Sequence, residues 1–232
     1  MESHQLINQT NSSVVVSQAL LRPTDLDEFV GQKRVKETLA MLIASSKIEG
    51  SALPHIIIQG AAGHGKTTLS LIASKASEES MITLLGPRVE TANELTKPLL
   101  QRRESWPVLF IDEIHSLKKK FQEVMYPVME DFIVHEVDVY RGTTYERKIN
   151  PFSLIGATTD PGKLTRPFRD RFQLTLRLEP YTSEQMTELV KKSAGKLEIT
   201  VEEEAEEIIA ARCRNSPRQA NNILGFCRRF AI

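Results

Sequence analysis

The sequence predicts an α/β fold: a doubly wound parallel sheet around a phosphate-binding loop, with an inserted β-hairpin and a small C-terminal helical domain. Three observations lead to this prediction. A phosphate-loop pattern at residues 60–67 lies between a strand-like and a helix-like segment. Up to Pro180, apolar runs typical of strands alternate with segments of helical period. After Pro180 only the helical period continues.

The phosphate loop at residues 60–67 reads Gly-Ala-Ala-Gly-His-Gly-Lys-Thr and fits the Walker A pattern G-x-x-x-x-G-K-[ST]. A β-branched run at 55–59 precedes it, and Leu69 follows at helical spacing. The loop is therefore expected at a helix N-terminus, where the dipole and free N–H groups favour anions. Lys66 is expected to reach the β- and γ-phosphates of ATP, and the Thr67 hydroxyl to ligate Mg²⁺. The other expected nucleotide contacts in this segment are Gly60, Gly63, His64, Gly65 and Thr68.

The elements around this loop follow from their periods. In chain order, we expect a helix after Gly31, a strand at 81–85, a helix at 92–100, a strand at 108–111, a helix at 117–128 and a strand at 153–157. The continuously apolar run at 108–111 is typical of a strand buried on both faces of a parallel sheet. Pro127 is expected to kink its helix. Strand patterns flanking a Gly-containing turn at 141–144 predict a β-hairpin over 133–150, which a doubly wound sheet does not need.

The C-terminal segment is expected to hold three helices. Ser183 is the expected cap of the first, and Ser216 with Pro217 opens the third. The second is expected to carry Val201, Ala205, Ile208 and Ile209 on one face, with Glu202–Glu207 as a solvated side. Cys213 and Cys227 are expected as small core residues. The predicted domains are a mobile tail at 1–18, in which Val14–Val16 favours a short strand, an α/β domain at 19–180 and a helical domain at 181–232.

The composition shows that net charge does not draw the whole chain to a partner. The 232 residues carry 30 Lys+Arg and 30 Asp+Glu, so no net field draws the whole chain to nucleic acid or to a membrane. No segment approaches the ~18 apolar residues that a membrane-spanning helix needs. The N-terminal residues lack the basic region of a signal peptide. We therefore expect a cytoplasmic protein with no membrane partner.

An acidic pair, Asp112-Glu113, follows the apolar run at 108–111. An acid at the exit of a buried strand beside a phosphate loop can anchor the Mg²⁺ of a bound triphosphate, so Thr67 and Asp112 form the expected metal set. The adjacent Glu113 can polarise the attacking water. Together with Lys66, this pair predicts ATP hydrolysis.

A series of longer motifs occurs in order from about residue 20 to the C-terminus. They are Leu21-Arg22-Pro23, Gly31-Gln32, the phosphate loop, Asp112-Glu113-Ile114-His115, Tyr126-Pro127, Met129-Glu130-Asp131-Phe132, Leu154-Ile155-Gly156-Ala157-Thr158-Thr159, Arg169-Asp170-Arg171-Phe172 and Ser216-Pro217-Arg218. On these motifs the chain resembles the AAA+ ATPases, and within them the RuvB family of motors that drive branch migration of Holliday junctions. The resemblance implies an AAA+ P-loop fold in which the helical domain is the lid.

The resemblance also implies roles for single residues. Thr159 corresponds to sensor 1 beside the γ-phosphate, and Arg218 to sensor 2 on the lid. Arg171 corresponds to the arginine finger, which reaches the nucleotide of a neighbouring subunit and stabilises transition-state charge; Arg169 is its nearest competitor. The residues implied to enclose the nucleotide base are Phe29, Val30, Tyr181 and Pro217, and Arg22 is a further implied nucleotide contact.

A finger acting on a neighbour implies a homo-oligomeric ring, a hexamer by family analogy, in which hydrolysis changes the angle between the two domains. The implied DNA partner is branched or double-stranded, and hairpin 133–150 matches the docking site for a RuvA-like adaptor. Lys118–Lys120 and Arg102-Arg103 are either solvated helix ends or contacts with a phosphate backbone.

This chain departs from the family pattern at its end, in its loop and in its hairpin. The family carries a winged-helix DNA-binding domain after the lid, whereas this sequence stops at Ile232, as a piece of a longer protein or as a compact variant. Gly60–Gly63 stands where the family has Pro-Pro, and the hairpin tip is more polar than the family's. The alternative function is an AAA+ loader or switch ATPase that places a clamp or helicase on DNA without translocating. A third is a non-hydrolysing assembly protein, against which Glu113, Thr159 and Arg171 argue.

Overall fold

The computed structural model describes residues 20–101, 106–138 and 142–229. The expected tail with its strand, the pair Arg102-Arg103 and residues 139–141 of the hairpin lie outside these residues. The chain divides into two compact units. Of the described residues, one unit comprises 20–32, 61–68 and 179–229, and the other comprises those within 33–60 and 69–178. The domain boundary expected at residue 180 stays a prediction.

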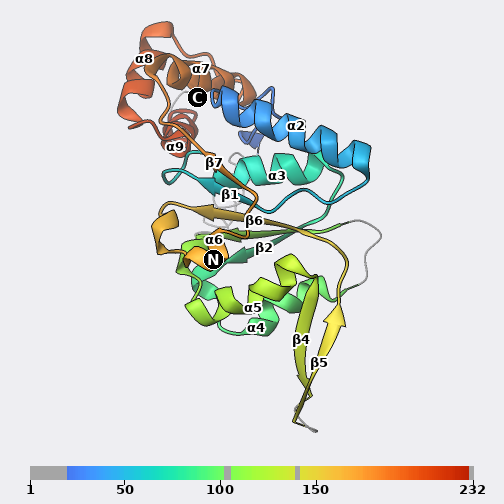
Figure 1. Cartoon of the computed structure of the whole chain (residues 1–232). Coiled ribbons are helices and arrows are strands. Elements are labelled where there is room, and N and C mark those ends of the chain that lie inside the picture. Colours follow the sequence, from blue (N-terminus) through green and yellow to red (C-terminus); the bar gives the residue numbers. More distant parts are fainter. Residues whose placement is uncertain (1–19, 102–105, 139–141, 230–232) are drawn as a thin grey trace, which may run out of the picture. The chain divides into compact units, whose positions relative to one another are not determined.

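The second unit is built on a five-stranded sheet with the order β2-β3-β6-β1-β7, in which every neighbouring pair is parallel (Figure 1). The strands are β1 (Ile56–Gln59), β2 (Met81–Leu85), β3 (Val108–Asp112), β6 (Ser153–Thr158) and β7 (Leu174–Arg177). The three central strands β3, β6 and β1 are almost wholly buried, in keeping with the apolar run of β3, the three isoleucines of β1 and the small or apolar residues inside β6. The predicted strands at 55–59, 81–85, 108–111 and 153–157 are therefore confirmed.

Strand β7 was not predicted from the sequence. It pairs with β1 at the edge of the sheet, from Ile56 opposite Leu174 to Gln59 opposite Arg177. Leu176 and Leu178 are buried, whereas Thr175 and Arg177 between them are exposed. This alternation of leucines with polar residues is typical of a half-buried strand. The signal covers only a few residues, which is why the strand was not predicted.

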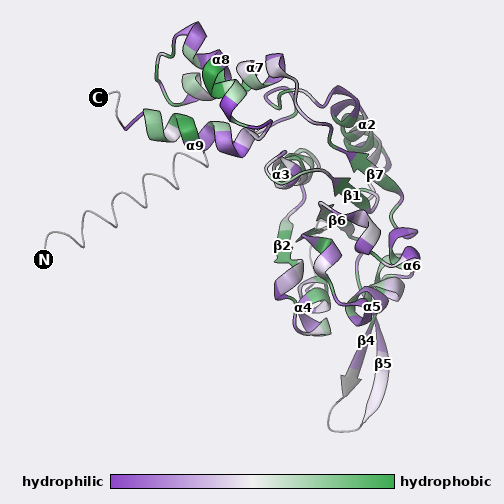
Figure 2. Cartoon of the chain, turned by 90° about the vertical axis from the view of Figure 1, so that its left-hand side faces the viewer, coloured by the Kyte–Doolittle hydropathy of each residue, from purple (hydrophilic) through white to green (hydrophobic). Residues whose placement is uncertain are grey.

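Helices cover both faces of the sheet, with α2 and α3 on one face and α4 and α5 on the other (Figures 1 and 2). These helices and the turn that follows α4 are α2 (Lys33–Glu49), α3 (Lys66–Ala76), α4 (Ala92–Thr96), the 3₁₀ turn η2 (Lys97–Leu99) and α5 (Lys119–Glu130). The helix expected over 92–100 changes to a 3₁₀ turn at Lys97, because Pro98 lacks the amide that a further helical bond needs. Helix α5 runs through Pro127 to Glu130.

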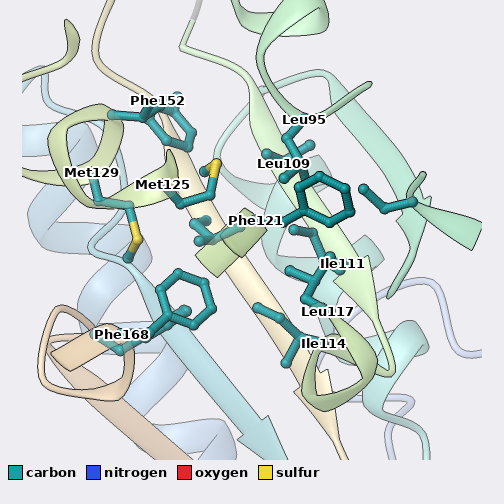
Figure 3. Close-up of a cluster of buried hydrophobic side chains, with 14 of the residues drawn as sticks. Leu95, Leu109, Ile111, Ile114, Leu117, Phe121, Met125, Met129, Phe152 and Phe168 are labelled. Atoms are coloured by element: carbon teal, nitrogen blue, oxygen red, sulfur yellow. The ribbon is translucent and has the colours of Figure 1, made fainter. Parts of the chain in front are cut away.

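The core of this unit lies between α5 and strand β3. Figure 3 shows Phe121 and Met125 of α5 beside Leu109 and Ile111 of β3, with Phe168 at the margin, and all five are buried. Burying an aliphatic or aromatic side chain contributes about 1.5–3 kcal/mol each, so these contacts hold α5 and the segment around Phe168 against the sheet. The remaining short elements of the unit are η1 (Gly86–Arg88), η3 (Ile114–Ser116), η4 (Pro161–Lys163) and α6 (Arg166–Arg169).

The predicted hairpin is confirmed as a separate two-stranded sheet. Strands β4 (Ile133–Asp138) and β5 (Thr143–Lys148) pair antiparallel, with Ile133 opposite Lys148 at the base. Every residue of β5 is exposed, and in Figure 2 its ribbon carries hydrophilic and neutral colours. Val134 near the base is buried in the core, where the partly buried Phe132 and Ile149 also pack. The hairpin is therefore a separate sheet that is anchored at its base and exposed along β5.

The first unit contains three helices, α7 (Ser183–Lys196), α8 (Glu203–Arg212) and α9 (Pro217–Cys227), around a core of their own. The expected cap at Ser183 is wrong by one residue. Thr182 has extended backbone angles, its Oγ1 accepts from the Gln185 amide at 3.3 Å, and Gln185 Oε1 accepts from the Thr182 amide at 3.1 Å. This capping box satisfies two amides, which Ser183 inside the helix cannot do. Pro217 opens α9 after Ser216, as predicted.

Two further expectations for this unit are corrected. Helix α8 leaves Ile208 60% exposed and buries Glu206, contrary to expectation, whereas Val201 and Ile209 pack against the core as expected. Cys213 is buried as predicted, but Cys227 at the last turn of α9 is exposed. Packing against α7 and α9 decides which residues of α8 are buried, and α9 contributes Ala220 and Leu224 to the same core but not Cys227.

Candidate nucleotide site

The phosphate loop leaves the sheet at the carboxyl end of β1. The Gly60 amide donates to the Thr158 carbonyl at 3.1 Å, which places the start of the loop beside the end of β6. Gly63 and Gly65 have φ angles of +80° and +96°, a region that residues with a side chain rarely adopt. A β-carbon would lie 2.6 Å from Ser216 Oγ at Gly63 and 2.7 Å from Phe29 Cζ at Gly65. Both glycines are required by conformation and by space.

Lys66 and Thr67 form the first turn of α3, directly after the loop. Lys66 is only 7% exposed, and its ammonium group donates to the Ala61 carbonyl at 3.1 Å, so it is folded back across the loop. Thr67 and Thr68 are half-buried. A loop closed by its own lysine at a helix N-terminus, with no β-carbons at the two glycines, fits the phosphates of ATP.

Aromatic residues of the same unit surround the loop at His64. The Tyr181 hydroxyl donates to the His64 carbonyl at 3.4 Å, and the two rings meet edge-on with centroids 5.8 Å apart. Phe29, Val30 and Tyr181 are all buried. Burial lowers the pKa of His64, and the Lys66 ammonium lowers it further. The imidazole is therefore neutral at pH 7, and its Nδ1 is buried without a hydrogen-bond partner.

The third helix of the unit brings Arg218 to the loop. The β-carbon of Arg218 would lie 3.3 Å from a β-carbon at Gly63, beside Ser216. Ser216 makes no side-chain cap bond to α9, so its hydroxyl faces the loop rather than its own helix. Arg22 lies apart from this cluster: its side chain is exposed, and its carbonyl accepts from Lys196 Nζ at 3.3 Å.

Gln32 also holds this unit together, and sequence reasoning missed it. Its side-chain amide donates to the Glu179 carbonyl at 2.7 Å and accepts from the Glu179 amide at 3.0 Å. These two bonds tie the N-terminal segment to the chain that enters the lid. The Gly31-Gln32 pair was visible as a motif, but only the fold shows its partner.

The acidic pair lies at the carboxyl edge of the sheet in the other unit. Asp112 ends β3, and the Glu113 amide donates to its carboxylate at 3.0 Å. Glu113 itself adopts a left-handed backbone with φ of 51°, which is uncommon for a residue with a side chain and typical of functional sites. Thr159, one residue beyond the end of β6, is exposed at the same edge.

His115 and Thr158 connect these strand ends and were not singled out from the sequence. His115 Nδ1 lies 3.2 Å from Glu113 Oε2 and 3.0 Å from Thr158 Oγ1. The Thr158 hydroxyl in turn accepts from the Asp160 amide at 2.9 Å. The signal for His115 was its place in the Asp112-Glu113-Ile114-His115 motif.

Arg171 lies at the opposite edge of the sheet. It precedes β7, and it lines a cavity of about 560 Å³ with His55 at the start of β1 and Phe152 before β6. Asp112 and Thr159 follow the ends of parallel strands in the same sheet. Arg171 is therefore separated from the acidic pair of its own chain by the length of the strands. Its neighbours Arg169 and Asp170 are exposed.

The structure thus brings together the loop, Phe29, Tyr181, Ser216 and Arg218 in one unit, and Asp112, Glu113 and Thr159 at one sheet edge in the other. Among the described residues, no three His, Cys, Asp or Glu side chains cluster as a metal site. None of the described helices is long and apolar enough to cross a membrane.

Known proteins resemble the chain along almost its whole length. Residues 21–178 match the family described as Holliday junction DNA helicase RuvB P-loop domain, and residues 181–232 match the RuvB AAA lid domain. The Holliday junction branch migration complex subunit RuvB of Kosmotoga olearia is 38% identical over 216 residues, which are 91% of this chain and 62% of that protein.

Solved structures give the same result. The RuvB Holliday junction branch migration motor of Thermotoga maritima is 35% identical, with a TM-score of 0.78 over 89% of this chain and 64% of that one. A point mutant of that protein is 36% identical, with a TM-score of 0.80 over 88% and 64% of the two chains. The chain therefore spans 62% to 64% of the length of these relatives.

Proposed function

This chain belongs to the RuvB family of AAA+ ATPases, and from that premise we propose that it is an ATP-hydrolysing motor that drives branch migration of Holliday junctions. The observation that carries the ATPase part is the meeting of Arg218 and Ser216 with the phosphate loop at Gly63. That contact supports a nucleotide held by the loop and the lid helix α9 together. The DNA part rests on the family.

In this proposal, ATP binds to the phosphate loop without a change in the backbone of the loop. The Lys66 ammonium exchanges the Ala61 carbonyl for β- and γ-phosphate oxygens, and the amides at Gly63 and Gly65 approach the phosphates. Mg²⁺, when bound through Thr67 and Asp112, neutralises the phosphate charge that develops during transfer. Phe29, Val30, Tyr181 and Pro217 enclose the base, while His64 and Arg22 complete the set proposed from the sequence.

Hydrolysis uses the acids at the sheet edge. Glu113 accepts a proton from a water molecule whose oxygen bonds to the γ-phosphorus, while the bond between that phosphorus and the bridging oxygen of ADP breaks. Thr159 and Arg218 contact the γ-phosphate. His115 orients the Glu113 carboxylate for this step through the 3.2 Å contact. Inorganic phosphate and ADP are the products.

Oligomerisation follows from where Arg171 lies. Because it is at the opposite sheet edge from Asp112, it serves the nucleotide of a neighbouring copy rather than its own. We therefore propose a homo-oligomeric ring, a hexamer by analogy with the family, acting in the cytoplasm on branched or double-stranded DNA. The hairpin of β4 and β5 is the proposed docking site for a RuvA-like adaptor, since β5 is exposed along its whole length.

Branch migration of a labelled four-way junction tests this function. We expect ATP-dependent strand exchange by the chain with a RuvA-type junction-binding partner, and none with Glu113→Gln, which keeps the size and polarity of the side chain but removes the carboxylate that accepts the proton. Both reactions are followed by the release of labelled duplex and, in parallel, by phosphate release. ATP turnover without strand movement in the presence of the partner would overturn the motor and favour a loader.

The adaptor site has its own test. Tyr145 in β5 is 49% exposed, so Tyr145→Ala is expected to lower partner-stimulated turnover and leave the turnover of the chain alone unchanged. Ile48 in α2, 86% exposed, offers a matched loss of exposed apolar surface away from the hairpin. Equal effects of Tyr145→Ala and Ile48→Ala on stimulation would exclude the hairpin as the docking site.

A further inference from the structure

Helix α5 presents a polar stripe to the segment that carries Arg171. Gln122, Tyr126 and Glu130 are spaced four residues apart, so they lie on one face of the helix. Gln122 is 1% exposed, and its side-chain oxygen accepts from the amide and the hydroxyl of Thr165 at 3.0 and 2.9 Å. Tyr126 is joined to the same Thr165 hydroxyl by a hydrogen bond of 3.1 Å. These bonds fix the start of α6 on α5.

The far end of this stripe holds the guanidinium of Arg171. Nη2 donates to Glu130 Oε2 at 3.0 Å, Nη1 donates to the Pro167 carbonyl at 2.6 Å, and the guanidinium carbon lies 4.1 Å from the centroid of the Tyr126 ring. The Arg171 side chain is only 20% exposed. One face and two edges of the group are therefore in contact with protein, although each terminal nitrogen keeps a second N–H.

The strength of these contacts decides what they do. The Glu130 side chain is 54% exposed, and an ion pair open to water contributes little free energy. Such a pair does not hold an arginine against a triphosphate, whose several negative charges compete with a single carboxylate. It does restrict a long side chain to few conformations, and a planar guanidinium held in advance loses less freedom when it binds phosphate.

We propose that Glu130 is a positioning residue for Arg171: with the Tyr126 ring beneath it, the carboxylate aims the guanidinium at the nucleotide of the neighbouring subunit. The proposal rests on the proposed function, because it needs Arg171 to be the finger. Glu130 touches no reacting atom and acts only through Arg171. Its loss therefore slows hydrolysis at a neighbour's site and leaves the nucleotide affinity of its own site unchanged.

Single substitutions give the first test, on the full chain assembled on ATP. Glu130→Ala is expected to lower kcat by about ten- to a hundredfold, the range for a misplaced catalytic group, with the KM for ATP changed by less than about twofold. Glu130→Gln is expected to fall between, since an amide oxygen still accepts from Nη2. Glu123→Ala is the matched control, because Glu123 is an exposed glutamate on the same helix; it should behave as the parent chain.

Mixed assemblies show through which subunit Glu130 acts. Lys66→Ala subunits have no working site but an intact finger, so mixing them with Glu130→Ala subunits should restore turnover. A Lys66→Ala, Glu130→Ala double variant mixed with Arg171→Ala subunits should restore much less than Lys66→Ala alone does. A general folding defect of Glu130→Ala would not depend on which partner carries the substitution. If the alanine variant does not fold, the same mixtures are made with Glu130→Gln.

The outcomes separate this inference from the proposed function. Full turnover by Arg171→Ala overturns the finger and the positioning role together. Loss of turnover by Arg171→Ala, with Glu130→Ala as active as Glu123→Ala, overturns the positioning role alone. The positioning role is also overturned if Lys66→Ala and the Lys66→Ala, Glu130→Ala double variant restore equal turnover when each is mixed with Arg171→Ala subunits. A kcat loss that is restored only by subunits with Glu130 intact supports it.

Discussion

His115 Nδ1 lies 3.2 Å from a carboxylate oxygen of Glu113, and the same nitrogen lies 3.0 Å from the hydroxyl of Thr158. One imidazole nitrogen therefore joins the acid after β3 to the hydroxyl at the end of β6. Because Thr159 is the next residue of the chain, the orientation of the proposed base and that of the proposed γ-phosphate sensor are linked through a single side chain.

Removing this imidazole should slow hydrolysis without weakening ATP binding. His115→Ala leaves Glu113 without its orienting partner and leaves a buried Thr158 hydroxyl short of a bond, and we expect kcat to fall about tenfold or more. His115→Asn should retain more activity, because its amide can take the place of Nδ1. His135→Ala, at an exposed position in β4, is the control. Phosphate release measures the rates; a His115→Ala chain as fast as the control would exclude the orienting role.

Gly63→Ala should abolish ATP binding. The methyl group would lie 2.6 Å from Ser216 Oγ at a φ of +80°, so the loop must move away from α9, and the left-handed backbone alone costs about 1–2 kcal/mol. Gly225→Ala in α9 has nothing within 4 Å of the new β-carbon and should bind normally, with stability raised by up to about 1 kcal/mol from helix propensity. Titration with a fluorescent ATP analogue compares the two. Unchanged affinity of Gly63→Ala would contradict the proposed contact between loop and lid.

Arg171→Ala should bind ATP with unchanged affinity and lose turnover by about a thousandfold, the usual effect of an arginine finger. The physical reason is that the finger serves a neighbour, so the site of the variant is intact and only its neighbour's site loses charge stabilisation. Mixing with Lys66→Ala subunits should return part of the activity at mixed interfaces. Arg169→Ala is the informative comparison: if it, and not Arg171→Ala, loses turnover, the finger is the competing arginine.

Glu79 should make stability depend on pH. It is 9% exposed, and burial raises its pKa from 4.5 to about 7, partly opposed by a hydrogen bond from the Leu53 amide. The folded protein then binds a proton that the unfolded chain releases, so the stability held below pH 4.5 falls as the pH rises to about 7, by up to about 3 kcal/mol.

Glu79→Gln should remove this slope. We expect urea unfolding to show the variant more stable than the parent at pH 8 and no more stable at pH 5. Glu78→Gln changes the neighbouring residue, whose side chain is 83% exposed, and should run parallel to the parent within about 0.5 kcal/mol. Parallel curves for Glu79→Gln would show that its carboxyl is not protonated in the folded state at neutral pH.

Local patterns predicted the parts of this molecule whose chemistry is contained in a few consecutive residues. The phosphate loop, the buried strands β3 and β6 and the hairpin were all predicted, because the period of apolar side chains, the spacing of glycines and apolar runs are short-range signals. Strand β7 was missed because half of its residues face water. The exposure of Ile208 and of Cys227 was missed because helical spacing does not show which apolar positions find a partner in the core.

The contacts that organise the site are of another kind. Residues 43 positions apart meet at His115 and Thr158, and residues 41 positions apart meet at Glu130 and Arg171. No periodicity encodes such a pair, since each partner is an ordinary polar residue until the sheet order places it. The phosphate loop belongs to the same unit as Tyr181 and Arg218. That grouping also depends on which residues the chain contacts after β7.

By itself, the sequence predicted a phosphate loop for nucleotide binding and acids at a strand end, and it identified the chain as a member of the RuvB family, because those properties lie in local backbone geometry and in fixed residue spacing. The tertiary structure decided which side chains act on one another. It set Arg171 at the amino edge of the sheet and Asp112 at the carboxyl edge, since parallel strands send their two ends to opposite sides. That separation is the physical reason why a complete site is expected to need two copies of the chain.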